Sequence, residues 1–346
     1  MPDTSATTTM PRPRRVVVFG LGGTIAMASG DSDGVVPALS AEELVAAVPG
    51  LTETGIELDV IDFRRVPSGS LSFDDIDALT EAIDERLAAG VDGDGADGIV
   101  VTQGTDTIEE TAYLLDLVHA HPNPVVVTGA MRPPAHAGAD GPGNLLAAIQ
   151  AAASPLTRDL GVVVVFADEI HAASRVRKTH ATSGFTFQSS NGGPLGYVVE
   201  GRPRVLSRPV GRTVLPAAIE SRQVEIGLLT MVLGDSGATL EAVAERVDGL
   251  VVAGFGAGHV PGHLVGTLDK IAARMPVVLA SRTGAGSVLE RTYGYPGSET
   301  DLLARGLISA GFLDPIKARI LLRQLMAGGH GHATMVSVFA SAGGWA

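Results

Sequence analysis

The chain has 346 residues, of which 45% are hydrophobic, 18% are charged and none is cysteine. Its formal net charge is −13, from 25 basic and 38 acidic residues, and only 4% of its residues are aromatic. This composition excludes intrinsic disorder as the main state and excludes disulfides, thiolate zinc ligation and a cysteine nucleophile. An acidic chain with few aromatic side chains is a poor nucleic-acid binder, so we expect no nucleic-acid partner.

The apolar runs and the N-terminus predict where the protein resides. No run approaches the roughly 18 apolar residues that a membrane-spanning helix needs, so we expect no membrane association. Residues 1–13 are rich in Thr, Pro and Arg and lack the apolar segment of a secretory signal. We expect these residues to form a disordered arm and the protein to be cytoplasmic.

Residues 14–200 alternate between short β-branched runs and longer amphipathic runs. Continuous Val and Ile runs indicate strands buried on both faces of a parallel sheet, at Arg14–Gly20, Gly98–Thr102, Pro124–Thr128 and Gly161–Phe166. Apolar residues at helical spacing predict helices between them, at Phe73–Ala89, Ile108–His119 and Asn144–Ala153. Strand–helix alternation of this kind predicts right-handed βαβ units in a mostly parallel sheet.

The pattern changes near Tyr197–Pro216, which is rich in Arg, Pro and Gly and has no helical period. We expect a hairpin there, leading into a linker at residues 201–222. Strand–helix alternation then resumes, at Val224–Met231, Ala238–Arg246, Gly249–Phe255, His263–Ala273, Pro276–Ser281 and Pro315–Ala327. The length suggests about two domains, and we therefore expect a larger N-terminal α/β domain (14–200) and a smaller, parallel C-terminal α/β domain (223–346).

A glycine-rich turn, Gly20-Leu21-Gly22-Gly23-Thr24, follows the first predicted strand. Its glycines let the backbone turn tightly and approach a ligand closely. A dinucleotide fingerprint is disfavoured, because Ile25 occupies the third glycine position and no helical pattern follows. Thr24 is then either a structural turn hydroxyl or a hydroxyl surrounded by backbone N–H groups that could stabilise an oxyanion.

Thr105 and Asp106 directly follow the predicted strand Gly98–Thr102. Thr107 with Glu110 fits a helix capping box, and a carboxylate is favoured at a helix N-terminus, so helix capping is one interpretation. Capping leaves unexplained why both Thr105 and Asp106 stand between the strand and the cap. A functional site is therefore the second interpretation.

The remaining charged and histidine residues give weaker signals. Arg132 and Asp140 lie in one loop, where internal pairing is the favoured interpretation. Lys178 lies in a basic run, where a lysine is usually solvated, but a desolvated lysine beside Thr105 and Asp106 could take a proton from a threonine hydroxyl. Two histidine pairs invite a metal-site interpretation, His259 with His263 and His330 with His332. Neither pair has a third ligand at suitable spacing, so we expect no metal site.

Taken in chain order, these segments resemble the bacterial L-asparaginase family of threonine amidohydrolases (types I and II). The resemblance runs over nearly the whole chain after the arm. The matching segments are Gly22-Gly23-Thr24-Ile25-Ala26, Gly104-Thr105-Asp106-Thr107 through Tyr113, Gly129-Ala130-Met131-Arg132-Pro133, Ala139-Asp140-Gly141-Pro142, Lys178-Thr179, Gly193–Tyr197 and Pro315–Leu322. The resemblance implies an asparaginase-like fold with flavodoxin-like layers.

The same resemblance implies a reaction and its catalytic residues. Thr24 would attack the side-chain amide of L-asparagine, release ammonia and form an acyl-enzyme that water converts to L-aspartate. Thr105, Asp106 and Lys178 would activate the nucleophile or the water, because a threonine hydroxyl needs a neighbouring base. No metal and no organic cofactor is implied.

The resemblance also implies how the substrate is bound. Ser68, after a strand at Asp59–Arg65, would hold the α-carboxylate, and Asp106 would hold the α-ammonium group. Ala130 would offer a backbone contact to the carboxamide, and the glycines before Thr24, Gly23 among them, would form a backbone oxyanion site. Glutamine differs from asparagine by one methylene, worth about 1–3 kcal/mol in a pocket, so a weaker glutaminase activity is compatible with these residues.

One departure from the family leaves part of the site open. The family commonly carries a tyrosine on the mobile loop after the nucleophile, but Met27–Pro37 contains none. Tyr293 and Tyr295 are candidate replacements or merely pack a turn, and Glu290 is a candidate for the α-ammonium group, from its own or a neighbouring subunit. The family implies a homo-oligomer, a dimer or tetramer.

Two alternative functions remain. One is a non-catalytic amino-acid binding or sensor protein on the same scaffold. The other is amide release for transfer onto an acylated tRNA, which the short N-terminal arm and the acidic charge disfavour.

Overall fold

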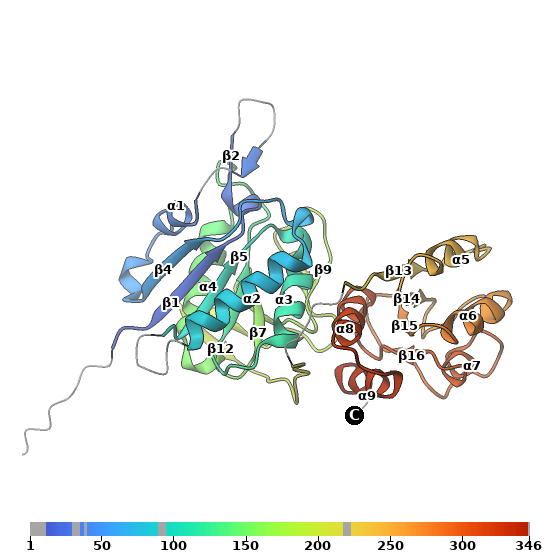
Figure 1. Ribbon diagram of the computed structural model, residues 1–346. Coiled ribbons are helices and arrows are strands. Elements are labelled where there is room, and N and C mark those ends of the chain that lie inside the picture. Colours follow the sequence, from blue (N-terminus) through green and yellow to red (C-terminus); the bar gives the residue numbers. More distant parts are fainter. Residues whose placement is uncertain (1–11, 30–34, 38–39, 89–94, 217–222, 345–346) are drawn as a thin grey trace, which may run out of the picture.

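The computed structural model describes residues 12–29, 35–37, 40–88, 95–216 and 223–344. Residues 1–11 of the predicted arm, 217–222 of the predicted linker and 345–346 lie outside these ranges. Figure 1 shows an α/β domain built from the N-terminal part of the chain and a smaller one built from the C-terminal part. The predicted fold class is confirmed, with the difference that the larger sheet is mixed.

The N-terminal sheet has eight strands. Five are mutually parallel and three antiparallel strands extend them. The change of direction follows β7, because Ala167 and Asp168 both adopt positive φ (49° and 64°) and close a two-residue hairpin. The spatial order is β12 (Arg202–Val205), β11 (Gly196–Val199), β8 (Glu169–Ala172), β7 (Val162–Phe166), β6 (Val125–Thr128), β5 (Gly98–Thr102), β1 (Arg15–Gly20) and β4 (Glu57–Asp62).

Helices cover both faces of this sheet, as the continuous Val and Ile runs predict. In β1, Val17 and Phe19 pack into the hydrophobic cluster beneath α2 (Phe73–Ala88) and α3 (Ile108–Val118). Val16 and Val18 belong to the opposite cluster, beneath α1 (Ala41–Ala46) and α4 (Gly141–Ala153). Helix α4 begins three residues earlier than predicted, because a proline in the first turn loses no helical hydrogen bond.

The C-terminal sheet is parallel throughout, in the order β13 (Ile226–Thr230), β14 (Gly249–Gly254), β15 (Val277–Ser281) and β16 (Ile308–Ser309). Its helices are α5 (Ala238–Ala244), α6 (Val265–Ala272), α7 (Glu299–Ala304), α8 (Pro315–Ala327) and α9 (His332–Ala342). Ala318 and Leu321 of α8 share one hydrophobic cluster with Leu114 and Leu115 of α3. The two domains are therefore packed together through α3 and α8.

Two small antiparallel pairs stand apart from these sheets, β2 (Met27–Ser29) with β3 (Val35–Pro37) and β9 (Arg177–Lys178) with β10 (Phe187–Gln188). The predicted hairpin after residue 196 is formed by β11 and β12, so the segment predicted as linker (201–222) contains a strand of the N-terminal sheet. Arg12 of the predicted arm forms an ion pair with Asp97 at 3.3 Å. Within the described ranges, no helix is long and apolar enough to cross a bilayer.

Candidate active site

Two loops leave the carboxyl edge of the sheet in direct backbone contact. Strands β1 and β5 are parallel neighbours, and Leu21 donates its backbone N–H to the Thr102 carbonyl at 2.8 Å. Gly23 (φ +86°) lies so close to the next loop that an added Cβ would stand 2.0 Å from the Gly104 nitrogen. Only glycine fits this approach. Thr24 and Thr105, the next residue in each loop, therefore start from adjacent points.

A third loop, after β4, joins this pair. The Ser68 hydroxyl accepts the Asp106 backbone N–H at 3.2 Å, and the Thr107 hydroxyl donates to the Ser68 carbonyl at 3.1 Å. Thr107 occupies the N-cap of α3 but its side chain makes no capping hydrogen bond, so the predicted capping box with Glu110 is wrong. Its hydroxyl instead ties the Ser68 loop to the Thr105 loop.

Lys178 reaches both predicted partners. Its Nζ donates to Thr105 Oγ1 at 2.9 Å and to Asp106 Oδ1 at 2.7 Å. The Lys178 side chain is only 16% exposed, whereas the Asp106 side chain is 74% exposed. The interpretation of Lys178 as a solvated surface lysine is therefore wrong. A hydroxyl, a carboxylate and an amine converge, and one face of the carboxylate stays open to solvent.

The loop after β6 brings Ala130 to the same edge. An added Cβ on Gly129 would lie 2.4 Å from the Gln103 carbonyl oxygen, so the two loops touch. Asp140 accepts the backbone N–H groups of Met131 and Arg132 at 3.0 and 2.9 Å. The expected structural pairing within this loop thus involves the Arg132 backbone, while the Arg132 guanidinium faces backbone carbonyls.

Two buried residues that the sequence did not single out brace this arrangement. Gln103 is fully buried and its amide nitrogen donates to Thr107 Oγ1 at 3.1 Å. Glu109, in the first turn of α3, accepts the backbone N–H of Lys178 at 3.3 Å. Burial raises the pKa of the Glu109 carboxyl, and the charge of Lys317 partly opposes that rise. An acid in a first helical turn is ordinary in sequence, so no local signal marks Glu109.

The tyrosines considered as replacements have other neighbours. Tyr293 and Tyr295 surround His259 in the C-terminal domain, with the Tyr295 hydroxyl 3.0 Å from His259 Nδ1. His259 Nε2 in turn lies 3.2 Å from a carboxylate oxygen of Glu299, whose side chain is fully buried. These contacts lie within the C-terminal domain and do not join the two tyrosines to the Thr105 group.

The histidine pairs have partners of their own. His263 and His332 each place Nε2 3.0 Å from a backbone carbonyl oxygen. Over the ranges that the structure covers, no group of three His, Asp or Glu side chains is arranged to hold a metal ion.

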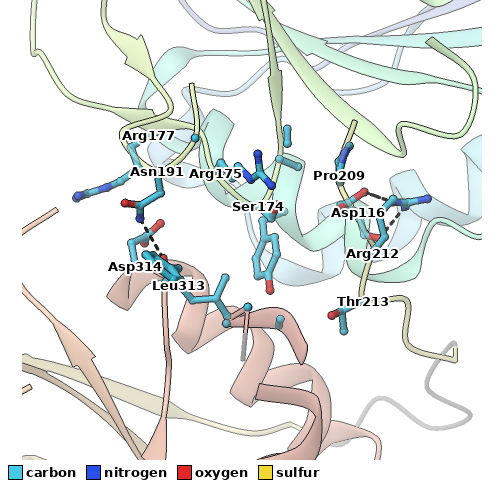
Figure 2. Close-up of a pocket in the computed structure, with 18 of the residues that line it drawn as sticks. Asp116, Ser174, Arg175, Arg177, Asn191, Pro209, Arg212, Thr213, Leu313 and Asp314 are labelled. Atoms are coloured by element: carbon cyan, nitrogen blue, oxygen red, sulfur yellow. Dashed lines mark hydrogen bonds and ion pairs between the residues drawn. The ribbon is translucent and has the colours of Figure 1, made fainter. Parts of the chain in front are cut away.

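A cavity of about 900 Å³ lies between the two domains (Figure 2) and is distinct from this group. Its lining includes Arg175, Arg177 and Asp314, together with an ion pair between Arg212 and Asp116 at 2.8 Å. None of the predicted site residues lines it. The candidate active site is therefore the cluster at the strand ends, and the cavity borders the segment that leads to Lys178.

Comparison with known proteins places the chain in a family. The model for "Asparaginase, N-terminal" matches residues 15–211, and that for "Glutaminase/Asparaginase C-terminal domain" matches residues 225–339. The chain belongs to the asparaginase family. It is similar to "Probable L-asparaginase" of Deinococcus radiodurans, with 39% identity over 90% of this chain and 92% of that one.

Two further asparaginases extend the likeness. "L-asparaginase" of Bacillus licheniformis is 33% identical over 91% of this chain and 96% of that protein. The crystal structure of "Probable Cytoplasmic L-asparaginase" from Campylobacter jejuni matches with a TM-score of 0.83 and 31% identity, covering 94% of this chain and 99% of that one. The resemblance inferred from the motifs is confirmed.

Proposed function

We propose that this asparaginase hydrolyses L-asparagine to L-aspartate and ammonia, with Thr24 as its nucleophile. The observation that carries the proposal is the contact of Lys178 with Thr105 and Asp106, next to the backbone junction of Gly23 and Gly104. The names of the similar proteins support an amidohydrolase of this type.

The first half-reaction transfers the acyl group to the enzyme. The Thr24 oxygen attacks the side-chain carbonyl carbon, and its proton passes to the departing nitrogen, which leaves as ammonia. Backbone N–H groups of the turn at Gly23 hold the negative oxygen of the tetrahedral intermediate, because fixed dipoles stabilise charge that develops in the transition state.

The second half-reaction frees the product. Water attacks the ester carbon and gives a proton to Thr105, which passes its own hydroxyl proton to Lys178, acting here as the free-base amine 2.9 Å away. That separation is within reach for direct proton transfer. The bond to Thr24 then breaks, the same proton returns through Thr105 to the Thr24 oxygen, and L-aspartate leaves.

Binding uses the charges of the substrate. The open face of the Asp106 carboxylate binds the α-ammonium group, since the side chain is 74% exposed while it pairs with Lys178. Ser68 accepts an N–H from Asp106, so its own proton remains available as a donor to the α-carboxylate. The Ala130 backbone contacts the carboxamide. Charge-assisted hydrogen bonds of this kind are stronger than neutral ones.

The test is ammonia release from asparagine and glutamine, measured side by side. Thr24→Ala should lose turnover to background while keeping its circular dichroism spectrum, and Thr24→Ser, which retains a hydroxyl, should retain part of it. Wild-type turnover in Thr24→Ala would reject Thr24 as nucleophile. Binding of asparagine by the wild type without ammonia release would favour the sensor function, and glutamine turnover would measure the weaker glutaminase activity.

We propose further that the protein is a cytoplasmic homo-oligomer. The likeness to the Campylobacter jejuni protein, which is named a probable cytoplasmic L-asparaginase, supports the location. Cell fractionation tests the location, and sedimentation velocity tests the assembly.

A further inference from the structure

A buried lysine of the C-terminal domain stands next to the segment that carries Lys178. Lys317 belongs to α8, and its side chain has no solvent exposure (0%). Its Nζ contacts three oxygens, the Val176 carbonyl, Asp314 Oδ2 at 3.0 Å and Glu109 Oε2 at 3.7 Å. Asp314 is the N-cap of α8 itself, whereas Val176 precedes β9 and Glu109 belongs to α3. Through the last two partners, the ammonium group joins α8 to the N-terminal domain.

The same cluster holds the backbone on both sides of Arg177. Lys317 donates to the Val176 carbonyl, and Glu109 accepts the Lys178 backbone N–H at 3.3 Å. The positive charge of Lys317 also favours the ionised form of the Glu109 carboxyl. Figure 2 shows Leu313 and Asp314 at the start of α8 facing the segment of Arg175 and Arg177. The two domains thus meet two residues before Lys178, at the Val176 carbonyl.

The segment needs such support because the main sheet does not hold it. Strand β9 has two residues and pairs only with the equally short β10 within the described structure. A two-stranded pair of this size has little stability of its own. The backbone position of Lys178 therefore depends on contacts from outside the pair.

We propose that Lys317 is a positioning residue, through which the C-terminal domain fixes Lys178 against Thr105. This inference rests on the proposed function of Lys178. Lys317 touches neither Thr105 nor the substrate site. It acts through the Val176 carbonyl and through Glu109, and its loss lets the Lys178 amine move away from Thr105.

Lys317→Met tests the inference in the full-length protein. We expect kcat for asparagine to fall about 10²-fold, the scale of a misplacement near 1 Å, with a much smaller change in KM. Deuterium exchange of the peptide covering residues 176–179 should accelerate. Arg319→Met is the matched control, because Arg319 lies on the same helix but contacts Ile226, Glu225 and the Phe73 ring.

A double variant keeps the test valid if Lys317→Met folds poorly. Lys317→Met with Glu109→Gln removes one of the two buried carboxylates that lose their partner and retains an acceptor for the Lys178 N–H. The other carboxylate, Asp314, still accepts the backbone N–H groups of residues 316 and 317. We expect the double variant to regain part of the thermal stability but to keep a low kcat. Wild-type kcat in either variant, or an exchange rate equal to that of Arg319→Met, would overturn the positioning role.

Deuterium exchange distinguishes a failure of this inference from a failure of the proposed function, because it does not depend on catalytic activity. If the wild-type protein releases no ammonia from asparagine, the proposed function fails. Faster exchange at residues 176–179 in Lys317→Met alone would still support the structural link.

Discussion

Lys178→Met should separate catalysis from stability. The amine lies 2.7 Å from Asp106 Oδ1 and 2.9 Å from Thr105 Oγ1. Methionine keeps the length and the apolar stem but removes the charge and all three N–H donors. In the proposed mechanism the site then loses the group that exchanges a proton with Thr105, while the surrounding packing is retained.

Lys178→Met should have a small effect on folding stability and a large effect on the catalytic rate. The Asp106 side chain is 74% exposed, so the ion pair contributes about 1 kcal/mol or less to stability. Such a loss lowers Tm by about 2–4 °C. Loss of a general acid–base group costs about 10²–10⁴-fold in rate, which corresponds to about 3–5 kcal/mol in the activation barrier. The effect on kcat should therefore exceed the effect on folding.

Coupled ammonia assays and thermal melts on the same preparation measure both quantities. Arg86→Met is the matched control, because Arg86 pairs with Asp59 at 2.7 Å on the surface of the same domain, outside the site. The control should show a similar small change in Tm and wild-type kcat. A Lys178→Met protein that turns over within about threefold of wild type would refute the reasoning, as would an equal loss of kcat in Arg86→Met.

Three further predictions concern binding, backbone contact and pH. Ser68→Ala should raise KM for asparagine about 10- to 100-fold through a lost charge-assisted hydrogen bond; an unchanged KM in initial-rate measurements would contradict this. Gly23→Ala should destabilise the protein far more than Gly50→Ala, because its Cβ would stand 2.0 Å from the Gly104 nitrogen whereas Gly50, also at positive φ, has open space; equal midpoints in urea melts would contradict it. Burial lowers the pKa of His119 to about 4, so the neutral ring contributes fully to folding stability above pH 6.5 and this contribution is lost as the pH falls toward 4. The free energy of unfolding should drop by on the order of 2 kcal/mol by pH 5 for this reason. His119→Gln should flatten this pH dependence, and parallel stability curves for wild type and variant would disprove it.

Local sequence signals predicted the parallel strands well, for a physical reason. The runs at Val16–Phe19 and Val162–Phe166 are apolar at every position because helices cover both faces of the sheet. The antiparallel strand β8 was not predicted, since its direction depends on two non-glycine residues at positive φ, Ala167 and Asp168. Composition gives no signal for that conformation.

The site was predictable only in part. Glycines and hydroxyls after strands β1 and β5 mark a sheet edge where ligands bind, but residues 105 and 178 are 73 positions apart, and no periodicity predicts their contact. The family resemblance supplied that pairing. Thr107 shows the opposite failure: its local pattern with Glu110 predicts a cap, whereas its hydroxyl binds Ser68 across 39 positions. For Thr107, a long-range partner outweighs the local capping preference.

The backbone contact of Gly23 with Gly104 and the side-chain contacts of Lys178 make different demands on the fold. The glycine contact brings the two threonine loops together, so any side chain at residue 23 disturbs packing and site geometry at once. The Lys178 side chain lies beyond that junction, and although its stem is largely buried, the proposed mechanism uses only its amine. Substitutions at the junction should therefore lower stability and turnover together, whereas substitutions of the side chains that the proposed mechanism uses should lower turnover far more than stability. Lys317 belongs to neither class: it is buried like the junction, yet it acts on Lys178 from another domain. Its loss should lower kcat and accelerate deuterium exchange at residues 176–179, while the contacts within α8 change less.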